Sequence, residues 1–167
     1  MPFGTLGYRW NLWNHGFLVM PDAYITALTM LSARELSEAQ LRVRLKRREL
    51  DAAEIDEAIA RLKSDRTLND RRVALAIARM ESAIKHRGRS RVLQKIRQAG
   101  IDDDTAQHAV QAVFEEVDED AMLDKAFERR LRGKAPKELD DKGRAKVIRG
   151  LVAQGFRFEA ILKRLKG

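Results

Sequence analysis

Apolar residues recur along this chain at spacings of three and four, which is the pattern of amphipathic α-helices. From Asp22 onward no segment alternates convincingly like a β-strand, so we expect nine helices separated by short turns. Polar residues suited to capping mark several helix starts, and Ser37 with Gln40 has the spacing of a capping box. Glycines mark several helix ends. The sequence therefore predicts an all-α fold.

The same helix–turn–helix pattern occurs three times. Apolar positions of the middle copy recur 51 residues upstream and 55 residues downstream. The three sets are Val92, Ile96, Ile101, Ala106 and Val110; Leu41, Leu45, Leu50, Ile55 and Ile59; and Val147, Leu151, Phe156, Ile161 and Leu165. A fixed offset indicates one supersecondary unit used repeatedly. We expect three tandem three-helix repeats, at residues 20–67, 68–117 and 118–167.

The helix that opens the middle repeat has the most regular apolar stripe. It begins at Asn69 or Asp70 and is expected to run to about Lys85. Its apolar side chains are spaced to lie on a single face of an α-helix. The sequence therefore predicts one buried stripe made of Val73, Ile77, Met80 and Ile84.

Residues 1–19 differ from the rest of the chain. They hold five of the ten aromatic residues, three glycines and one charged residue, Arg9. Without a basic segment and a continuous apolar core, they do not match a signal peptide. We expect either a loosely ordered N-terminal extension or a natural start at Met20. An aromatic docking peptide is the functional alternative.

The composition favours a binding protein over an enzyme. The 167 residues include 33 Lys+Arg and 25 Asp+Glu, a net charge of +8 that suits polyanionic partners. There is no cysteine, and the three histidines are too scattered to share a metal, so we expect no metal and no cofactor. Acids at residues 118–120 are better explained as helix caps than as a catalytic pair. We expect no enzymatic activity and no small-molecule substrate.

Two further absences bear on location. No apolar run approaches the roughly 20 residues of a membrane helix, so we expect no membrane partner. The lack of cysteine fits a reducing compartment, and we expect a cytoplasmic protein.

Basic residues gather on particular helices. Residues 42–48 and 85–97 contain five and six Lys or Arg and no acid, whereas residues 102–124 contain nine acids and no Lys or Arg. Solubility and helix macrodipoles explain individual charges. Clusters of like charge repel one another, however, and a partner that neutralises them recovers that cost. We predict partner or DNA binding by Arg42, Arg44, Arg47, Arg48, Arg87, Arg89, Arg91, Lys95, Arg129, Arg130, Arg132, Arg144, Lys146 and Arg149.

The helix–turn–helix units raise the alternative of sequence-specific DNA recognition, in which the second helix of the motif enters the major groove. Here those helices begin with acids, Asp51 and Glu54 in one unit and residues 102–104 in the next, which phosphates would repel. The basic stretches also lack the interleaved aromatic residues that stack single-stranded bases. Two hypotheses remain for the basic clusters: electrostatic contact with a nucleic-acid backbone, or contact with an acidic groove of a protein.

The order of several segments resembles the RecX family, bacterial regulators of the RecA recombinase. The resemblance covers nearly all of residues 23–165. Its segments are residues 27–37, residues 67–74, Arg79, residues 87–102, and Gly155 with Phe156. One departure is Glu49, which stands where the other two repeats have a turn glycine.

The resemblance implies an elongated, curved molecule, a right-handed-type array of the three helical repeats. It implies binding to the RecA–DNA filament, with DNA contacted directly or through the filament. Inhibition of the recombinase, ATPase and coprotease activities of RecA would follow, and the SOS response would be modulated. We expect a monomer. The alternative is a stand-alone basic nucleic-acid-binding module, which would bind DNA tightly without RecA and lose affinity steeply with salt.

Overall fold

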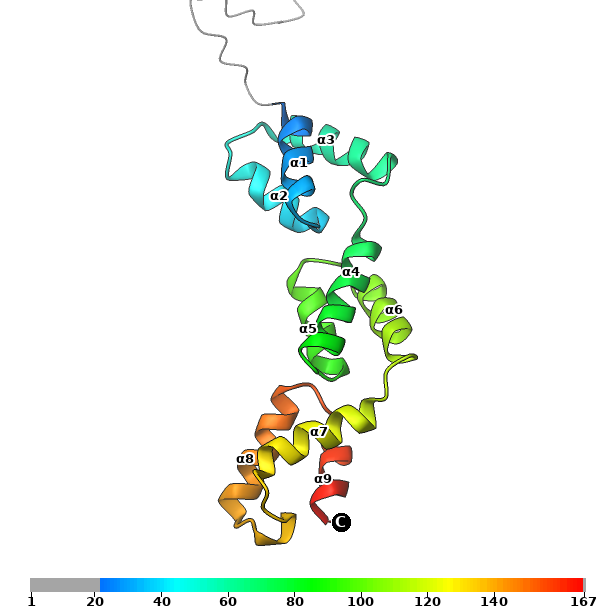
Figure 1. The fold of residues 1–167 in the computed structure, drawn as a ribbon. Helices are drawn as coiled ribbons and strands as arrows, with labels where there is room; N and C mark the ends of the chain where they lie inside the picture. Colours follow the sequence, from blue (N-terminus) through cyan, green and yellow to red (C-terminus); the bar gives the residue numbers. More distant parts are fainter. Residues whose placement is uncertain (1–21, 167) are drawn as a thin grey trace, which may run out of the picture.

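The computed structural model describes residues 22–166, and its regular elements in that range are helical (Figure 1). Their bounds are α1 Ala23–Ala33, α2 Glu38–Lys46, α3 Ala52–Ser64, α4 Asp70–Arg79, the π-helix η1 Met80–Ile84, α5 Arg89–Gln98, α6 Asp103–Phe114, α7 Glu119–Leu131, the 3-10 helix η2 Pro136–Glu138, α8 Asp141–Ala153 and α9 Phe158–Lys166. This confirms the predicted all-α fold. The predictions for residues 1–19 and for Met20 lie outside the described residues.

Side-chain caps set most of the helix starts. Backbone N–H groups in the first turn of a helix have no partner within the helix, and a preceding polar side chain can accept from them. Ser37 completes the predicted capping box, because its Oγ accepts from Gln40 N while Gln40 Oε1 accepts from Ser37 N. The side-chain caps are Asp22, Ser37, Asp51, Asn69, Asp102, Asp118 and Asp140.

Each group of three α-helices encloses its own hydrophobic core. We call α1–α3 repeat 1, α4, η1, α5 and α6 repeat 2, and α7, η2, α8 and α9 repeat 3. The largest buried side chains include the predicted positions Leu41, Leu45, Ile55 and Ile59 in repeat 1, Val92 and Ile96 in repeat 2, and Leu151 and Ile161 in repeat 3. The three units follow one another in an elongated, curved row (Figure 1). The residue limits predicted for the repeats stay a prediction.

The predicted stripe of the fourth helix is wrong in its second half. The α-helix gives way to a π-helical turn that begins at Met80. A π-helix has more residues per turn than an α-helix, so the side chains that follow Met80 are rotated away from the stripe. Met80 is 41% exposed and Ile84 is 73% exposed. Glu81 and Ser82 are buried in their place.

Glu81 is a buried carboxylate whose charge is matched by its neighbours in the chain. Its Oε1 lies 2.7 Å from Nζ of Lys85, and its Oε2 lies 3.1 Å from NH1 of Arg87. The backbone N–H of Arg87 also donates to the Glu81 carbonyl, at 3.0 Å. Burying a carboxylate is costly unless it is paired. The two cations therefore stabilise the turn that leads into α5.

The second helices of the three repeats, α2, α5 and α8, meet end to end. Ser37, the N-cap of α2, donates from Oγ to the carbonyl of Ala99, the C-cap of α5. Gly88, the N-cap of α5, donates from its backbone N to the carbonyl of Gln154, the C-cap of α8, at 2.9 Å. A positive helix N-terminus thus faces a negative helix C-terminus at both junctions, which is favourable. We call α2, α5 and α8 the helix row.

Glycine is required where each junction is tightest. Gly100 has φ +77°, and a Cβ on it would overlap Cβ of Ala39 at the start of α2. Gly155 has φ +95°, and a Cβ on it would overlap backbone atoms of Arg91 and Gly88. A residue with a side chain is disfavoured at these φ values and has no room at either place.

The same comparison explains Glu49. It occupies the turn of repeat 1 that corresponds to Gly100 and Gly155, with φ +60°. Its side chain is exposed, and within residues 22–166 no other repeat packs on this turn. The steric need for glycine is therefore lifted at Glu49, and only the backbone strain remains.

Glu49→Gly is expected to stabilise repeat 1 by about 0.5–1 kcal/mol. An L-residue in the left-handed region costs about 1–2 kcal/mol of stability, and glycine removes this strain. Glycine also gives the unfolded chain more conformational entropy, which offsets roughly 0.5–1 kcal/mol of the gain. Urea unfolding measures the difference. Glu49→Ala keeps the strain and serves as the control, so a glycine variant less stable than the alanine variant would contradict this explanation.

Candidate partner-binding surface

The repeat offsets place four positions of each second helix on one face, because they are spaced i, i+3, i+4 and i+7. The three sets are Gln40, Val43, Arg44 and Arg47; Arg91, Gln94, Lys95 and Gln98; and Lys146, Arg149, Gly150 and Ala153. Each set has two basic residues and no acid. We call the six basic residues the basic face: Arg44, Arg47, Arg91, Lys95, Lys146 and Arg149.

None of the six cationic groups of the basic face forms an ion pair with a carboxylate within residues 22–166. Within residues 22–166, five of the six side chains have neither an ion pair nor a hydrogen bond. The sixth, Arg91, bonds only to Oε1 of Gln94, at 2.6 Å. Arg47, Lys146 and Arg149 are exposed and the other three are half-buried. These charges therefore remain available to an anionic partner.

A groove at the junction of repeats 1 and 2 adjoins the basic face of repeat 1. It has a volume of about 310 Å³ and is lined by Arg44 and Arg47 on α2 and by Gln98 at the end of α5. Arg34, which follows α1, also lines it. The charge clusters of the sequence do not include Arg34, because it stands apart from the basic cluster at residues 42–48. Only the folding of α1 against α2 brings it there.

Arg42 serves a structural role. It forms ion pairs with Glu38 on its own helix and with Asp56 on α3. Lys63 on α3 also contacts Glu38, at 2.7 Å. Lys63 and Arg42 together hold the pKa of Glu38 below its usual range, despite partial burial. This network ties α2 to α3 inside repeat 1.

Arg89 joins repeat 2 to repeat 3. Its Nε lies 3.1 Å from Oε2 of Glu119, in the first turn of α7, and its guanidinium carbon lies 4.9 Å from the centre of the Phe114 ring. Arg87, as described above, pairs with Glu81. The structure thus accounts for both arginines without a partner, and a further role for either in binding stays a prediction.

The remaining predicted residues lie outside the helix face that carries the six. Arg129 donates to the Lys125 carbonyl on its own helix, and Arg130 donates to the Gly150 carbonyl at 2.9 Å, which links α7 to α8. Arg48, Arg132 and Arg144 are exposed. Their part in binding likewise stays a prediction.

The start of α6 is strongly negative. The backbone N–H of Thr105 lowers the pKa of Asp102, and Arg97 lowers the pKa of Asp103. Both carboxylates therefore stay charged at neutral pH. Phosphates would be repelled from this helix, which supports the argument against a DNA-recognition helix here.

Two other kinds of site are not found in the described part of the chain. Between residues 22 and 166, no three His, Asp or Glu side chains are grouped so that they could hold a metal ion. Over the same residues, no helix is both long and apolar enough to span a membrane.

Comparison with known proteins identifies the family. Residues 23–62 match the model of the first three-helix domain of RecX. The chain is 33% identical to the regulatory protein RecX of Syntrophotalea carbinolica over 81% of this chain and 88% of that protein. It is 27% identical to the RecX of Trichlorobacter lovleyi over 84% of this chain and 91% of that protein.

Solved structures agree on the fold. A crystal structure of a regulatory protein RecX has a TM-score of 0.74 at 21% identity, and covers 86% of this chain and 70% of its own. RecX from Lactobacillus salivarius has a TM-score of 0.70 at 20% identity, and covers 86% of this chain and 92% of its own. The relatives are named as regulatory proteins, and the chain belongs to the RecX family.

Proposed function

We propose that this protein is a non-enzymatic regulator of RecA that binds the RecA–DNA filament and inhibits its recombinase, ATPase and coprotease activities, thereby modulating the SOS response. Membership of the RecX family supports a regulatory role. The observation that carries the proposal is the basic face, which repeats on all three second helices of an elongated molecule. A partner with a repeating surface, such as a protein filament on DNA, can be contacted several times by such an array.

The chemistry of the basic face suits anionic surfaces of any sequence. Its side chains are long cations on one side of α-helices, without aromatic residues among them. Such groups neutralise phosphates or carboxylates and give an affinity that falls with salt. They attract the protein to the anionic surface and orient it there, but they make no base-specific contact.

A second candidate function is direct binding to nucleic acid without RecA. The unpaired cations of the basic face favour it, because they need no protein partner to attract DNA. For a single strand, each neutralised phosphate should contribute a slope of about −0.7 to the dependence of log affinity on log salt.

Fluorescence anisotropy with labelled single-stranded DNA separates the two functions. At physiological ionic strength of about 0.15 M, we expect binding to RecA-coated DNA at concentrations at least tenfold lower than binding to bare DNA. Equal affinity for the two would favour the second function. Binding to bare DNA alone would contradict the first.

A further inference from the structure

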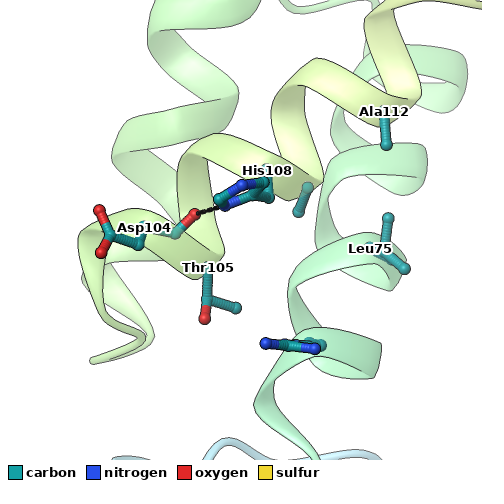
Figure 2. Close-up of a pocket in the computed structure, with 7 residues that line it drawn as sticks. Leu75, Asp104, Thr105, His108 and Ala112 are labelled. Carbon is teal, nitrogen blue, oxygen red and sulfur yellow. Dashed lines mark hydrogen bonds between the residues drawn. The ribbon is translucent and has the colours of Figure 1, made fainter.

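Repeat 2 has an open groove between its first and third helices, α4 and α6. The groove has a volume of about 600 Å³. Figure 2 shows Leu75 of α4 and Ala112 of α6 pointing towards each other across it, and Ala109 completes an apolar floor. Polar groups stand along the α6 side, where His108 Nδ1 donates to the Asp104 carbonyl at 2.7 Å.

In repeats 1 and 3 an arginine of the third helix crosses the corresponding place. Arg61 of α3 lies over the ring of Tyr24 on α1, with 4.0 Å between its guanidinium carbon and the ring centre. Arg164 of α9 forms ion pairs with Asp120 and Asp124 on α7.

The two positions that hold these arginines are alanine in repeat 2. By the offset of 51 residues Arg61 corresponds to Ala112, and by the offset of 55 residues Arg164 corresponds to Ala109. Repeat 2 therefore has no arginine on its third helix to reach across to the first helix, as each of its neighbours has. The neighbours show that an arginine guanidinium can contact the first helix from this side.

We infer that the α4–α6 groove of repeat 2 is a docking site for a basic side chain, arginine or lysine, of a protein partner. The aliphatic stem of the incoming residue would lie on Leu75, Ala109 and Ala112, as long cationic side chains commonly do. Its charged end would reach the carboxylate of Asp104, which is exposed at the rim.

Charge makes this surface a site for protein and not for nucleic acid. Residues 102–124, which include all of α6, hold nine acids and no Lys or Arg. Arg71 of α4 is the cation among the lining residues, and it also lines a second pocket together with Asp70 and Asp102. A phosphate backbone would be repelled by α6, whereas a basic side chain would be attracted.

This inference rests on the proposed function, because the partner to be tested is RecA. It divides the molecule into two surfaces, with anionic groups of the filament held by the basic face and a basic residue of the RecA protein held by the α4–α6 groove. The two contacts differ in the sign of the charge that they bind, so they can be removed separately.

Two variants of the full chain test the groove. Ala112→Arg introduces the arginine of repeat 1, which fills the groove and repels a basic residue. Ala112 is exposed, so folding should be retained, and circular dichroism checks this. Asp104→Asn removes the carboxylate and keeps the size of the side chain. Ala76→Arg, at an exposed alanine of α4 that does not line the groove, is the control with the same added charge.

Binding to RecA-coated single-stranded DNA is the readout. We expect Ala112→Arg to weaken binding at least tenfold and Asp104→Asn to weaken it several-fold, with Ala76→Arg unchanged and binding to bare DNA unaffected by Asp104→Asn. Wild-type affinity of Ala112→Arg would overturn the docking site. Wild-type or tighter binding of Asp104→Asn would overturn the basic occupant. Failure of the wild-type chain to bind RecA-coated DNA would instead overturn the proposed function, and this inference with it.

Discussion

Gly155→Ala is expected to open the junction between repeats 2 and 3, at a cost of about 2–4 kcal/mol. A non-glycine residue in the left-handed region costs about 1–2 kcal/mol by itself. The new Cβ would also overlap backbone atoms of Gly88 and Arg91, which cannot move aside without shifting α5. The junction hydrogen bonds from Gly88 N and Ser90 N to repeat 3 should then be lost.

Amide hydrogen exchange locates this effect. The N–H groups of Gly88 and Ser90 lie at the start of α5, where no acceptor within the helix is available. Their protection depends on Gln154 and Gly155 of repeat 3. We expect their exchange to accelerate at least tenfold in Gly155→Ala, while amides in the cores of both repeats keep their protection.

Gly133→Ala is the matched control. Gly133 has φ +84°, close to that of Gly155, but a Cβ on it would meet no atom within 4 Å. This variant carries the backbone strain without the overlap, and we expect a loss of about 1–2 kcal/mol and unchanged exchange at Gly88 and Ser90. Equal effects of the two variants would show that the close approach at the junction has no energetic role.

Reversing the charges of Arg44 and Arg47 is expected to weaken binding to RecA-coated DNA at least tenfold. Both side chains lie on the basic face, line the groove at the junction of repeats 1 and 2, and have no ion pair within residues 22–166. Their reversal should therefore remove the proposed contacts to the partner, and it breaks no ion pair or side-chain hydrogen bond within residues 22–166. The double variant Arg44→Glu, Arg47→Glu should also show a shallower salt dependence of binding than the wild type.

The control reverses two charges elsewhere. Lys137 in η2 and Lys142 in α8 are exposed and lie outside the basic face. Lys137→Glu, Lys142→Glu produces the same net charge, so it reports any loss that comes from overall charge alone. Circular dichroism should give wild-type helix content for both variants. Equal weakening by the two pairs would contradict the placement of the contact on the basic face.

The fold was predictable from the sequence because its determinants are local. Caps such as Ser37 and Asp102 act within one helical turn, and the spacing of apolar residues in each helix predicts which side is buried. The π-helical turn at Met80 could not be predicted in this way. A local count of spacing assumes 3.6 residues per turn, and the burial of Glu81 in place of Met80 depends on Lys85 and Arg87, which neutralise it.

The candidate surface was predictable only as a set of clusters. The clusters of charge along the chain predict partner binding for Arg44 and Arg89 alike. The structure distinguishes them, because Arg44 has no ion-pair partner among residues 22–166 whereas Arg89 is bound to Glu119 on another repeat. Arg34 belongs to no charge cluster of the sequence, because its neighbours in the groove are distant in sequence. Ion pairs between helices decide which basic side chains are free to bind a partner, and these ion pairs cannot be derived from the composition.

The open groove of repeat 2 became visible only when structure and repeat were combined. In the sequence, Ala109 and Ala112 are unremarkable helix residues. In the alignment of the repeats, Arg61 stands at the position of Ala112 and Arg164 at the position of Ala109. The structure shows that both arginines cross to the first helix of their repeat. Alanine at both positions thus marks the repeat in which no arginine makes this crossing.

The single-stranded-DNA-dependent ATPase activity of RecA is the decisive measurement for the proposed inhibition. The purified protein is titrated into RecA filaments formed on single-stranded DNA, with Arg44→Glu, Arg47→Glu titrated in parallel. From the proposed function, we expect the wild-type chain to lower ATP hydrolysis in proportion to its binding and the double variant to do so only at concentrations at least tenfold higher. Undiminished hydrolysis at several-fold molar excess of the wild-type chain over RecA would contradict it.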